Sequence, residues 1–169
     1  AWLVRDLLYQ NSLVVLAGDS GVGKSILGYT ASIAISAGLP LLNLPTTPAR
    51  VLYFDEENSQ PDAQQYFRWA WRGLGGPDAA ELDRALRFEH FSLSSYNGPW
   101  WDCMSQAARE HRPGLIVVDT ATPACRVRDE NDNAEATFII KHLRIVQLAA
   151  DARTAMLILK RARVSHDPV

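Results

Sequence analysis

Cysteine is scarce in this chain of 169 residues, which contains only Cys103 and Cys125. Two cysteines are too few for a disulfide framework, and their separation is not that of a metal-binding pair. We therefore expect free thiols, as in proteins of a reducing cytoplasm, and exclude the disulfide-stabilised and zinc-ribbon classes.

The chain also lacks long hydrophobic runs and an excess of either charge. No apolar run approaches the roughly 18 residues of a membrane-spanning helix, and no basic-then-apolar leader opens the sequence, so we expect no membrane association. A net charge of −2 gives no general attraction to nucleic acid, although a local basic patch stays open. Ala1 in place of methionine and the abrupt end "HDPV" lead us to expect a single domain, residues 1–169, trimmed at both ends.

Apolar runs and helical periodicities alternate along the chain. Strands are expected at 12–17, 50–55, 87–91, 114–120 and 154–160, and helices at 24–37, 61–74, 99–110 and 134–150. The last helix carries one apolar stripe, while Gln147 is placed on its polar face. Strands that are apolar throughout and separated by helices predict an α/β fold, with a mainly parallel sheet covered on both faces.

A glycine-rich stretch, "GDSGVGKS", follows the first expected strand and opens the first expected helix. It matches the pattern G-x-x-x-x-G-K-[ST] in full, in which backbone N–H groups surround phosphate oxygens. Lys24 is predicted to reach the β- and γ-phosphates, and the Ser25 hydroxyl to bind Mg²⁺. The predicted nucleotide-binding residues are Gly18, Asp19, Ser20, Gly21, Val22, Gly23, Lys24, Ser25 and Ile26.

Two other nucleotide-binding classes fit less well. A dinucleotide fingerprint, G-x-G-x-x-G, would start at Gly21, but Ile26 occupies the place of its last glycine. The sequence also lacks the NKxD motif of GTPases and the LSGGQ motif of transporter ATPases. A nucleoside triphosphate, held at the ligand-binding edge of the sheet, is the remaining interpretation.

Acidic residues end two of the expected strands. Asp119 closes "LIVVD" and is predicted to bind Mg²⁺. Thr120 follows it, so a carboxylate that orients the attacking water must come from elsewhere. The cluster Asp55-Glu56-Glu57 ends another strand, and alternation along that strand does not decide between Glu56 and Glu57.

Four segments in order, "VVLAGDSGVGKS", "RVLYFDEEN", "GLIVVDTATPA" and "RDENDNAEA", resemble RecA-like ATPases. The likeness covers nearly the whole chain and is closest to the RepA-type hexameric replicative helicases, with RadA and KaiC more distant. It implies a RecA-like core in which the strand at 154–159 lies between the P-loop strand and the strand at 115–119, with the strand at 50–55 next. It also favours Glu57 as the catalytic glutamate, with Glu56 as the alternative.

The loop "DENDN", at 129–133, has two further interpretations. A calcium loop is excluded, because Ala134 replaces its glycine and Ile140 its bidentate glutamate. Its asparagines can cap the next helix, which is compatible with the position that the resemblance implies, facing a central channel or a neighbouring subunit.

The last strand departs from the RecA-like pattern. Where these relatives carry histidines or a glutamine that senses the γ-phosphate, this chain has Lys160-Arg161-Ala162-Arg163. We expect Lys160 or Arg161 to act as a finger from the neighbouring subunit, with ATP and Mg²⁺ as cofactors. The resemblance further implies a homo-oligomeric ring, a hexamer, acting on single-stranded DNA in replication. A P-loop small-molecule kinase and a nucleotide-dependent regulatory switch stay open as alternatives.

Overall fold

The computed structural model describes residues 1–90, 93, 95–121, 125 and 133–162. In it, five strands form one parallel sheet in the order β3 (Leu13–Gly18), β7 (Ala155–Arg161), β6 (Leu115–Asp119), β4 (Val51–Asp55) and β5 (Leu86–His90). This arrangement confirms the expected fold class and the expected place of β7 between β3 and β6. β4 and β6 are buried along their whole length, which is why their sequences are apolar up to the final aspartate.

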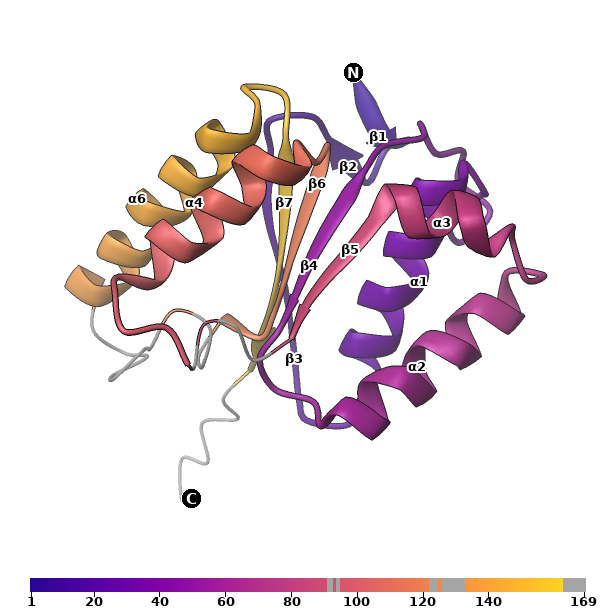
Figure 1. The fold of residues 1–169 in the computed structure, drawn as a ribbon, viewed down its shortest axis with the longest axis horizontal. Coiled ribbons are helices and arrows are strands. Elements are labelled where there is room, and N and C mark those ends of the chain that lie inside the picture. Colours follow the sequence, from indigo (N-terminus) through magenta and orange to yellow (C-terminus); the bar gives the residue numbers. More distant parts are fainter. Residues whose placement is uncertain (91–92, 94, 122–124, 126–132, 163–169) are drawn as a thin grey trace, which may run out of the picture.

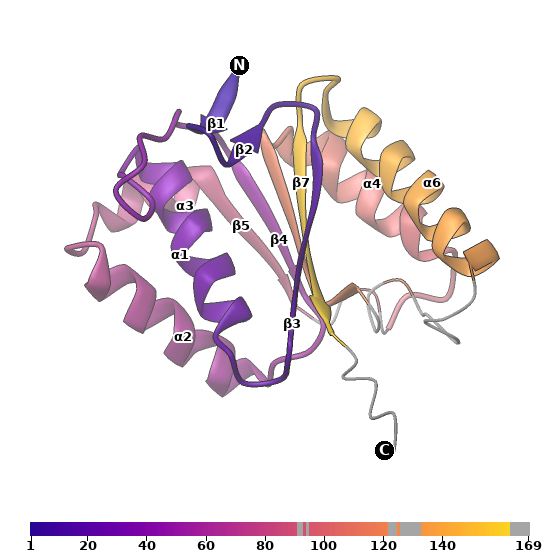
Figure 2. The same ribbon diagram turned by 180° about the vertical axis from the view of Figure 1, so that it is seen from behind.

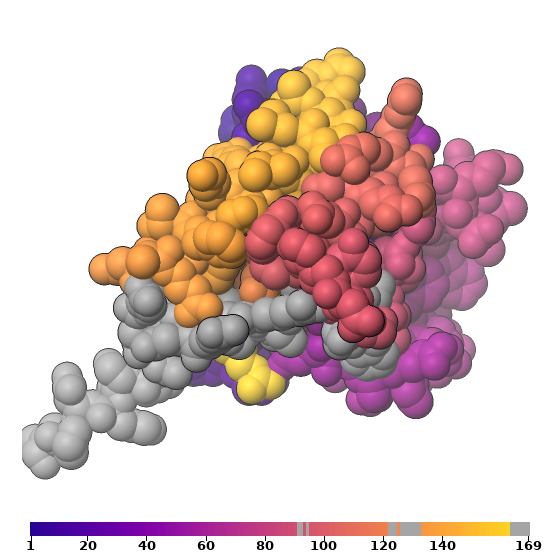
Figure 3. Space-filling model, turned by 60° about the vertical axis from the view of Figure 1, so that its left-hand side comes forward, coloured from indigo at the N-terminus to yellow at the C-terminus, as the bar shows by residue number. Residues whose placement is uncertain are grey.

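Helices cover both faces of the sheet (Figures 1 and 2). One layer holds α1 (Lys24–Ala37), α2 (Gln60–Gly73) and α3 (Ala79–Ala85), and the other α4 (Trp100–His111) and α6 (Asn133–Ala150). Figure 3 shows α4 and α6 lying side by side on their face. Each layer has its own hydrophobic cluster, one around Tyr53 and Leu159 and the other around Phe54 and Ile158. Neighbouring residues of one strand therefore point into different layers.

Three short elements were not expected from the sequence. β1 (Trp2–Val4) pairs antiparallel with β2 (Leu8–Tyr9) at the edge of the domain where β3 begins. α3 lies between α2 and β5, begins at the cap Asp78, and buries a single residue, Leu82. With so few buried residues, none of these elements carries a clear hydrophobic period.

Gln147 lies on the buried side of α6, although its polarity predicted an exposed position. Its side chain is 1% exposed, and its Nε2 donates to the carbonyl oxygens of Thr154, at 2.5 Å, and Ser12, at 3.1 Å. These bonds satisfy carbonyl groups just before β7 and β3. Because its amide is hydrogen-bonded, the Gln147 side chain can be buried where an apolar side chain would be expected. Within the described residues, no helix is long and apolar enough to cross a membrane.

Candidate nucleotide-binding site

The glycine-rich loop connects β3 to α1 at the edge of the sheet where β3, β4 and β6 end (Figure 1). Gly21 and Gly23 have φ angles of +79° and +92°, a region that L side chains rarely adopt. Gly23 is also the N-cap of α1, so the first N–H groups of the helix receive no side-chain cap from it. A helix N-terminus with open N–H groups is an anion-binding site.

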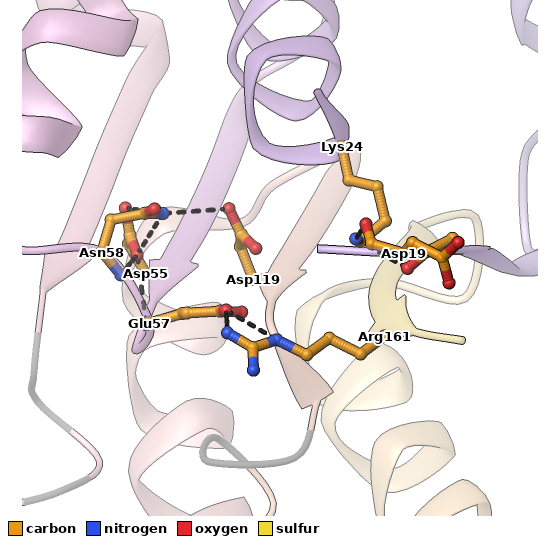
Figure 4. A network of polar contacts seen from close by, with 8 residues as sticks. Asp19, Lys24, Asp55, Glu57, Asn58, Asp119 and Arg161 are labelled. Atoms are coloured by element: carbon orange, nitrogen blue, oxygen red, sulfur yellow. Dashed lines mark hydrogen bonds and ion pairs between the residues drawn. The ribbon is translucent and has the colours of Figure 1, made fainter. Parts of the chain in front are cut away.

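Lys24 folds back over this loop. Its Nζ donates to the carbonyl oxygens of Gly18, at 2.8 Å, and Asp19, at 2.7 Å. These bonds hold the ammonium beside the loop's backbone (Figure 4). The loop thus carries a fixed positive charge next to its open N–H groups, which is the chemistry that phosphate oxygens require.

A cavity of about 320 Å³ lies over the loop. It brings together six of the nine predicted nucleotide-binding residues with side chains from the ends of β4, β6 and β7. Gly18, Asp19 and Val22 complete the loop but do not line this cavity. Its lining residues are Ser20, Gly21, Gly23, Lys24, Ser25, Ile26, Glu57, Asn58, Tyr66, Thr120 and Arg161.

Asp119, the predicted Mg²⁺ ligand, lies at the end of β6 and is fully buried. Its Oδ2 accepts hydrogen bonds from the Tyr53 hydroxyl, at 2.7 Å, and from Asn58 Nδ2, at 3.3 Å. Its Oδ1 accepts none from the described part of the chain. A buried carboxylate oxygen with an open lone pair, close to the Ser25 hydroxyl, fits a hard divalent cation such as Mg²⁺. The described residues contain no cluster of three histidine, cysteine, aspartate or glutamate side chains that could hold a metal without further ligands.

Burial and, to a smaller extent, the nearby carboxylates of Asp55 and Glu57 raise the pKa of Asp119 from 3.8 to about 6, while the hydrogen bond from Tyr53 and the nearby Ser25 hydroxyl oppose the shift. Between about pH 4 and pH 6 the folded chain therefore binds a proton here that the unfolded chain has released. The free energy of unfolding must fall as the pH rises through this window. Above about pH 6 the cost of burying the charge is present in full.

We therefore expect Asp119→Asn to be more stable than the wild-type chain at pH 8, since the amide removes a buried charge and can still accept from Tyr53. The difference should shrink as the pH falls from 6 towards 4. Urea denaturation of both proteins across this range, without nucleotide or Mg²⁺, measures it. An advantage that stays constant with pH would contradict the assignment of a raised pKa to Asp119.

A polar network that the sequence did not predict links Asp119 to Asp55. Asp55 is 1% exposed, accepts a hydrogen bond from the Tyr29 hydroxyl, and accepts the backbone N–H and the Nδ2 of Asn58, both at 3.0 Å. Asn58 Nδ2 thus bridges the two aspartates (Figure 4). Asp55 and Asp119 are direct partners in the register of β4 and β6, so their strand-end positions were the signal that could have revealed the network.

Two stacked tyrosines support this network from the side of α1. The rings of Tyr29 and Tyr53 have centroids 4.7 Å apart and are nearly parallel. Burial and the carboxylates that they contact raise the pKa of both hydroxyls, which therefore stay protonated as donors. Gly28 gives Tyr53 the necessary space, because a Cβ at Gly28 would lie 2.9 Å from the tyrosine oxygen.

The two candidate glutamates lie in different surroundings. Glu56 is 8% exposed, and its Oε1 accepts from the backbone N–H of Leu93 at 3.2 Å, a residue of the cluster under α4. Glu57 lines the cavity over the loop and contacts Arg161, whose Nε lies 3.0 Å from Glu57 Oε1 (Figure 4). Of the two, only Glu57 faces the space where a nucleotide would lie.

Lys160 and Arg161 are adjacent in β7, so they lie on opposite faces of the sheet. Arg161 is in step with Leu159, which packs in the layer of α1, and it reaches the cavity of its own chain. Lys160 is in step with Ile158, which packs in the layer of α4 and α6, and it does not line the cavity. Arg163 and most of the "DENDN" loop lie outside the described residues.

A second cavity, of about 400 Å³, is lined in part by Asp55 and Tyr29 of the polar network. Three of its lining residues, Tyr29, Phe67 and Phe88, are aromatic, and Phe67 and Phe88 are in edge-to-face contact with ring centroids 5.6 Å apart. Its polar groups come from Asp55, His90 and three residues of α2, which are Gln60, Gln64 and Arg68. Its lining residues are Tyr29, Asp55, Gln60, Ala63, Gln64, Phe67, Arg68, Phe88 and His90.

Comparison with known proteins agrees with this geometry. A search of curated proteins found no match. A family model described as an AAA domain, a P-loop ATPase-like family, matches residues 1–163. The match covers both hydrophobic layers and every described residue of the cavity over the loop. The chain therefore belongs to the AAA domain family of P-loop ATPase-like proteins.

Proposed function

We propose that this domain binds ATP with Mg²⁺ and hydrolyses it. The observation that carries the proposal is the convergence of three chemically distinct groups on one cavity of about 320 Å³. The loop and Lys24 supply positive charge for phosphate, Glu57 supplies a base, and the Ser25 hydroxyl supplies an oxygen ligand for a cation. The buried Asp119, which precedes the lining residue Thr120 in the chain, offers a second oxygen ligand through its open Oδ1. Hydrolysis of a phosphoanhydride by a P-loop protein requires this set.

Each group has a definite task in this proposal. The N–H groups of the loop and the Lys24 ammonium bind the β- and γ-phosphates. Ser25 and Asp119 would hold Mg²⁺, which when bound offsets the negative charge of the phosphates. The Glu57 carboxylate accepts a hydrogen bond from the attacking water, orients it and takes its proton. Asn58 and Tyr53 fix the orientation of Asp119, because both donate hydrogen bonds to its Oδ2.

We further propose that the ATPase is the motor core of a DNA helicase or of a related replication or recombination ATPase, because the order of its motifs resembles the RepA-type helicases. The test is a phosphate-release assay on size-fractionated protein, with and without single-stranded DNA. Stimulation by the DNA, confined to the oligomeric fraction, is the expected result. Equal rates in every fraction with and without DNA would contradict the motor assignment.

Hydrolysis is expected to depend on assembly, and Lys160 is the candidate that reaches a neighbouring site. A cation from a neighbour stabilises the charge of the transition state and contributes about 10³- to 10⁵-fold in rate. Because Arg161 lies in the cavity of its own chain, Lys160 is the better candidate for this task. Lys160→Ala should lower turnover in the oligomer and leave ATP affinity unchanged.

The rate per subunit, measured across protein concentrations, tests this expectation. It should rise with concentration for the wild-type protein and much less for Lys160→Ala. Lys141→Ala, which removes an exposed lysine on α6, is the matched control and should behave like the wild type. A flat rate from a monomer, unaffected by Lys160→Ala, would show that the site is complete within one chain.

A P-loop kinase acting on a small molecule is the second candidate, and the cavity of about 400 Å³ is the observation that favours it. This cavity lies beside the network that holds Asp119, at the ligand-binding edge of the sheet, and an acceptor with an apolar body would fit its aromatic walls. Phosphate transfer to an added alcohol, with little release of inorganic phosphate in its absence, would favour the kinase over the ATPase.

A further inference from the structure

Among the described residues that line the cavity, Glu57, the proposed base, is paired with Arg161, one of the two cations. Arg161 donates two N–H groups to the same oxygen of Glu57, Nε at 3.0 Å and Nη2 in closer contact. The side chains are 56% and 27% exposed, respectively. While this pair is intact, Glu57 Oε1 is occupied by the guanidinium, and its capacity to accept a hydrogen bond from water is reduced.

Arg161 is fixed to the phosphate-binding loop through its backbone. It is the last residue of β7 and the direct partner of Gly18 in the parallel register with β3. The next amide, of Ala162, donates to the Gly18 carbonyl oxygen at 2.9 Å, the same oxygen that Lys24 contacts. The Cα of Arg161 therefore lies beside the start of the loop, and Arg161 is one of the residues that line the cavity.

Lys24 and Arg161 have different hydrogen-bond partners, and a nucleotide could replace the partner of Arg161 more easily. Lys24 donates to backbone carbonyls of its own loop. Arg161 donates to a carboxylate through an exposed pair, and such pairs contribute little stability. A terminal phosphate offers more charge and accepts a planar guanidinium in a bidentate arrangement. Bound nucleotide would thus compete well for Arg161.

We propose that Arg161 is a latch on the catalytic base. Without bound nucleotide, Arg161 holds Glu57. When a nucleoside triphosphate binds, Arg161 exchanges the carboxylate for the terminal phosphate, which frees Glu57 to orient water. The latch rests on the proposed ATP hydrolysis and adds its regulation: a diphosphate, which lacks the terminal group, leaves the pair closed. No neighbouring subunit is needed for this exchange.

A double-mutant cycle on nucleotide affinity tests the latch without relying on turnover. Fluorescence titrations with a non-hydrolysable ATP analogue and with ADP would compare the wild type, Arg161→Gln, Glu57→Gln and the double variant. Arg161→Gln should weaken analogue binding about tenfold or more, the scale of a hydrogen bond to a charged group, and change ADP affinity less than about twofold. Glu57→Gln should tighten analogue binding up to about fivefold, because the exposed pair no longer has to open.

The decisive result is the coupling between the two substitutions. The gain from Glu57→Gln should disappear in the Arg161→Gln background and persist in the Arg161→Lys background. Arg153→Gln, which breaks an exposed arginine–aspartate pair away from the cavity, should change neither affinity. A gain that persists without Arg161 would reflect general relief of negative charge and would overturn the latch. Equal losses of ADP and analogue affinity in Arg161→Gln would overturn it as well.

Failure of the latch and failure of the proposed function give different results. If the wild-type chain binds both nucleotides in a Lys24-dependent way and the cycle shows no coupling, only the latch is overturned. If the wild-type chain binds neither nucleotide, the proposed function is overturned and the latch with it.

Discussion

Glu57→Gln should bind Mg·ATP at least as tightly as the wild-type domain and hydrolyse it at least about a hundredfold more slowly. The amide keeps the shape of the side chain but cannot take a proton from water, and loss of a positioned base has effects of this size. The cavity that Glu57 lines keeps its other residues, so binding should survive. Phosphate release at saturating ATP, with binding measured on the same sample, separates the two effects.

Glu56→Gln is the matched control for this experiment. Glu56 neighbours Glu57 in sequence, but its carboxylate accepts a backbone hydrogen bond from Leu93 and faces away from the cavity. Its replacement should leave turnover within a few-fold of the wild type, and it should affect stability more than rate. If Glu56→Gln abolished turnover and Glu57→Gln did not, the assignment of the base would be wrong by one residue.

Lys24→Ala should abolish detectable ATP binding. The substitution removes the cation that lies against the loop's backbone at the position of the phosphates, and it also removes the two hydrogen bonds that hold this cation to Gly18 and Asp19. Titration with a fluorescent nucleotide measures the effect. An unchanged midpoint of urea denaturation would show that the fold is intact, and Lys141→Ala controls for the loss of one lysine. Unchanged affinity in Lys24→Ala would contradict the assignment of the loop.

Periodicity alone predicted most of the fold, because the central strands are buried on both faces and their sequences show it. The observed ends of β4 and β6 are each within one residue of the expected ends, and those of α1 are identical to them. The order of the strands, by contrast, came from the resemblance, since a buried apolar strand carries no mark of its neighbours. Gln147 was misplaced because its polarity is satisfied by carbonyl groups from two distant strand starts, which no local pattern reveals.

The loop was the part of the site that the sequence indicated most directly, since its glycines, lysine and serine are contiguous and their spacing carries the chemistry. The choice between Glu56 and Glu57 could not be made from the residues, because it depends on how the chain turns after β4. The network of Asp55, Asn58 and two tyrosines was missed, as its members come from α1, β4 and the following turn. The contact between Arg161 and Glu57 joins residues 104 positions apart and likewise exists only in the fold.

Under the proposed function, the cavity over residues 18–26 is the Mg·ATP site. Hydrogen–deuterium exchange of the wild-type domain, with and without Mg²⁺ and a non-hydrolysable ATP analogue, tests it most directly, because it locates binding whether or not turnover is detectable. Slower exchange of the amides at 18–26 and 56–58 is the predicted result, with Lys24→Ala showing no change. Saturable binding that leaves these amides unprotected, or that protects only the residues around the second cavity, would show that the nucleotide binds elsewhere.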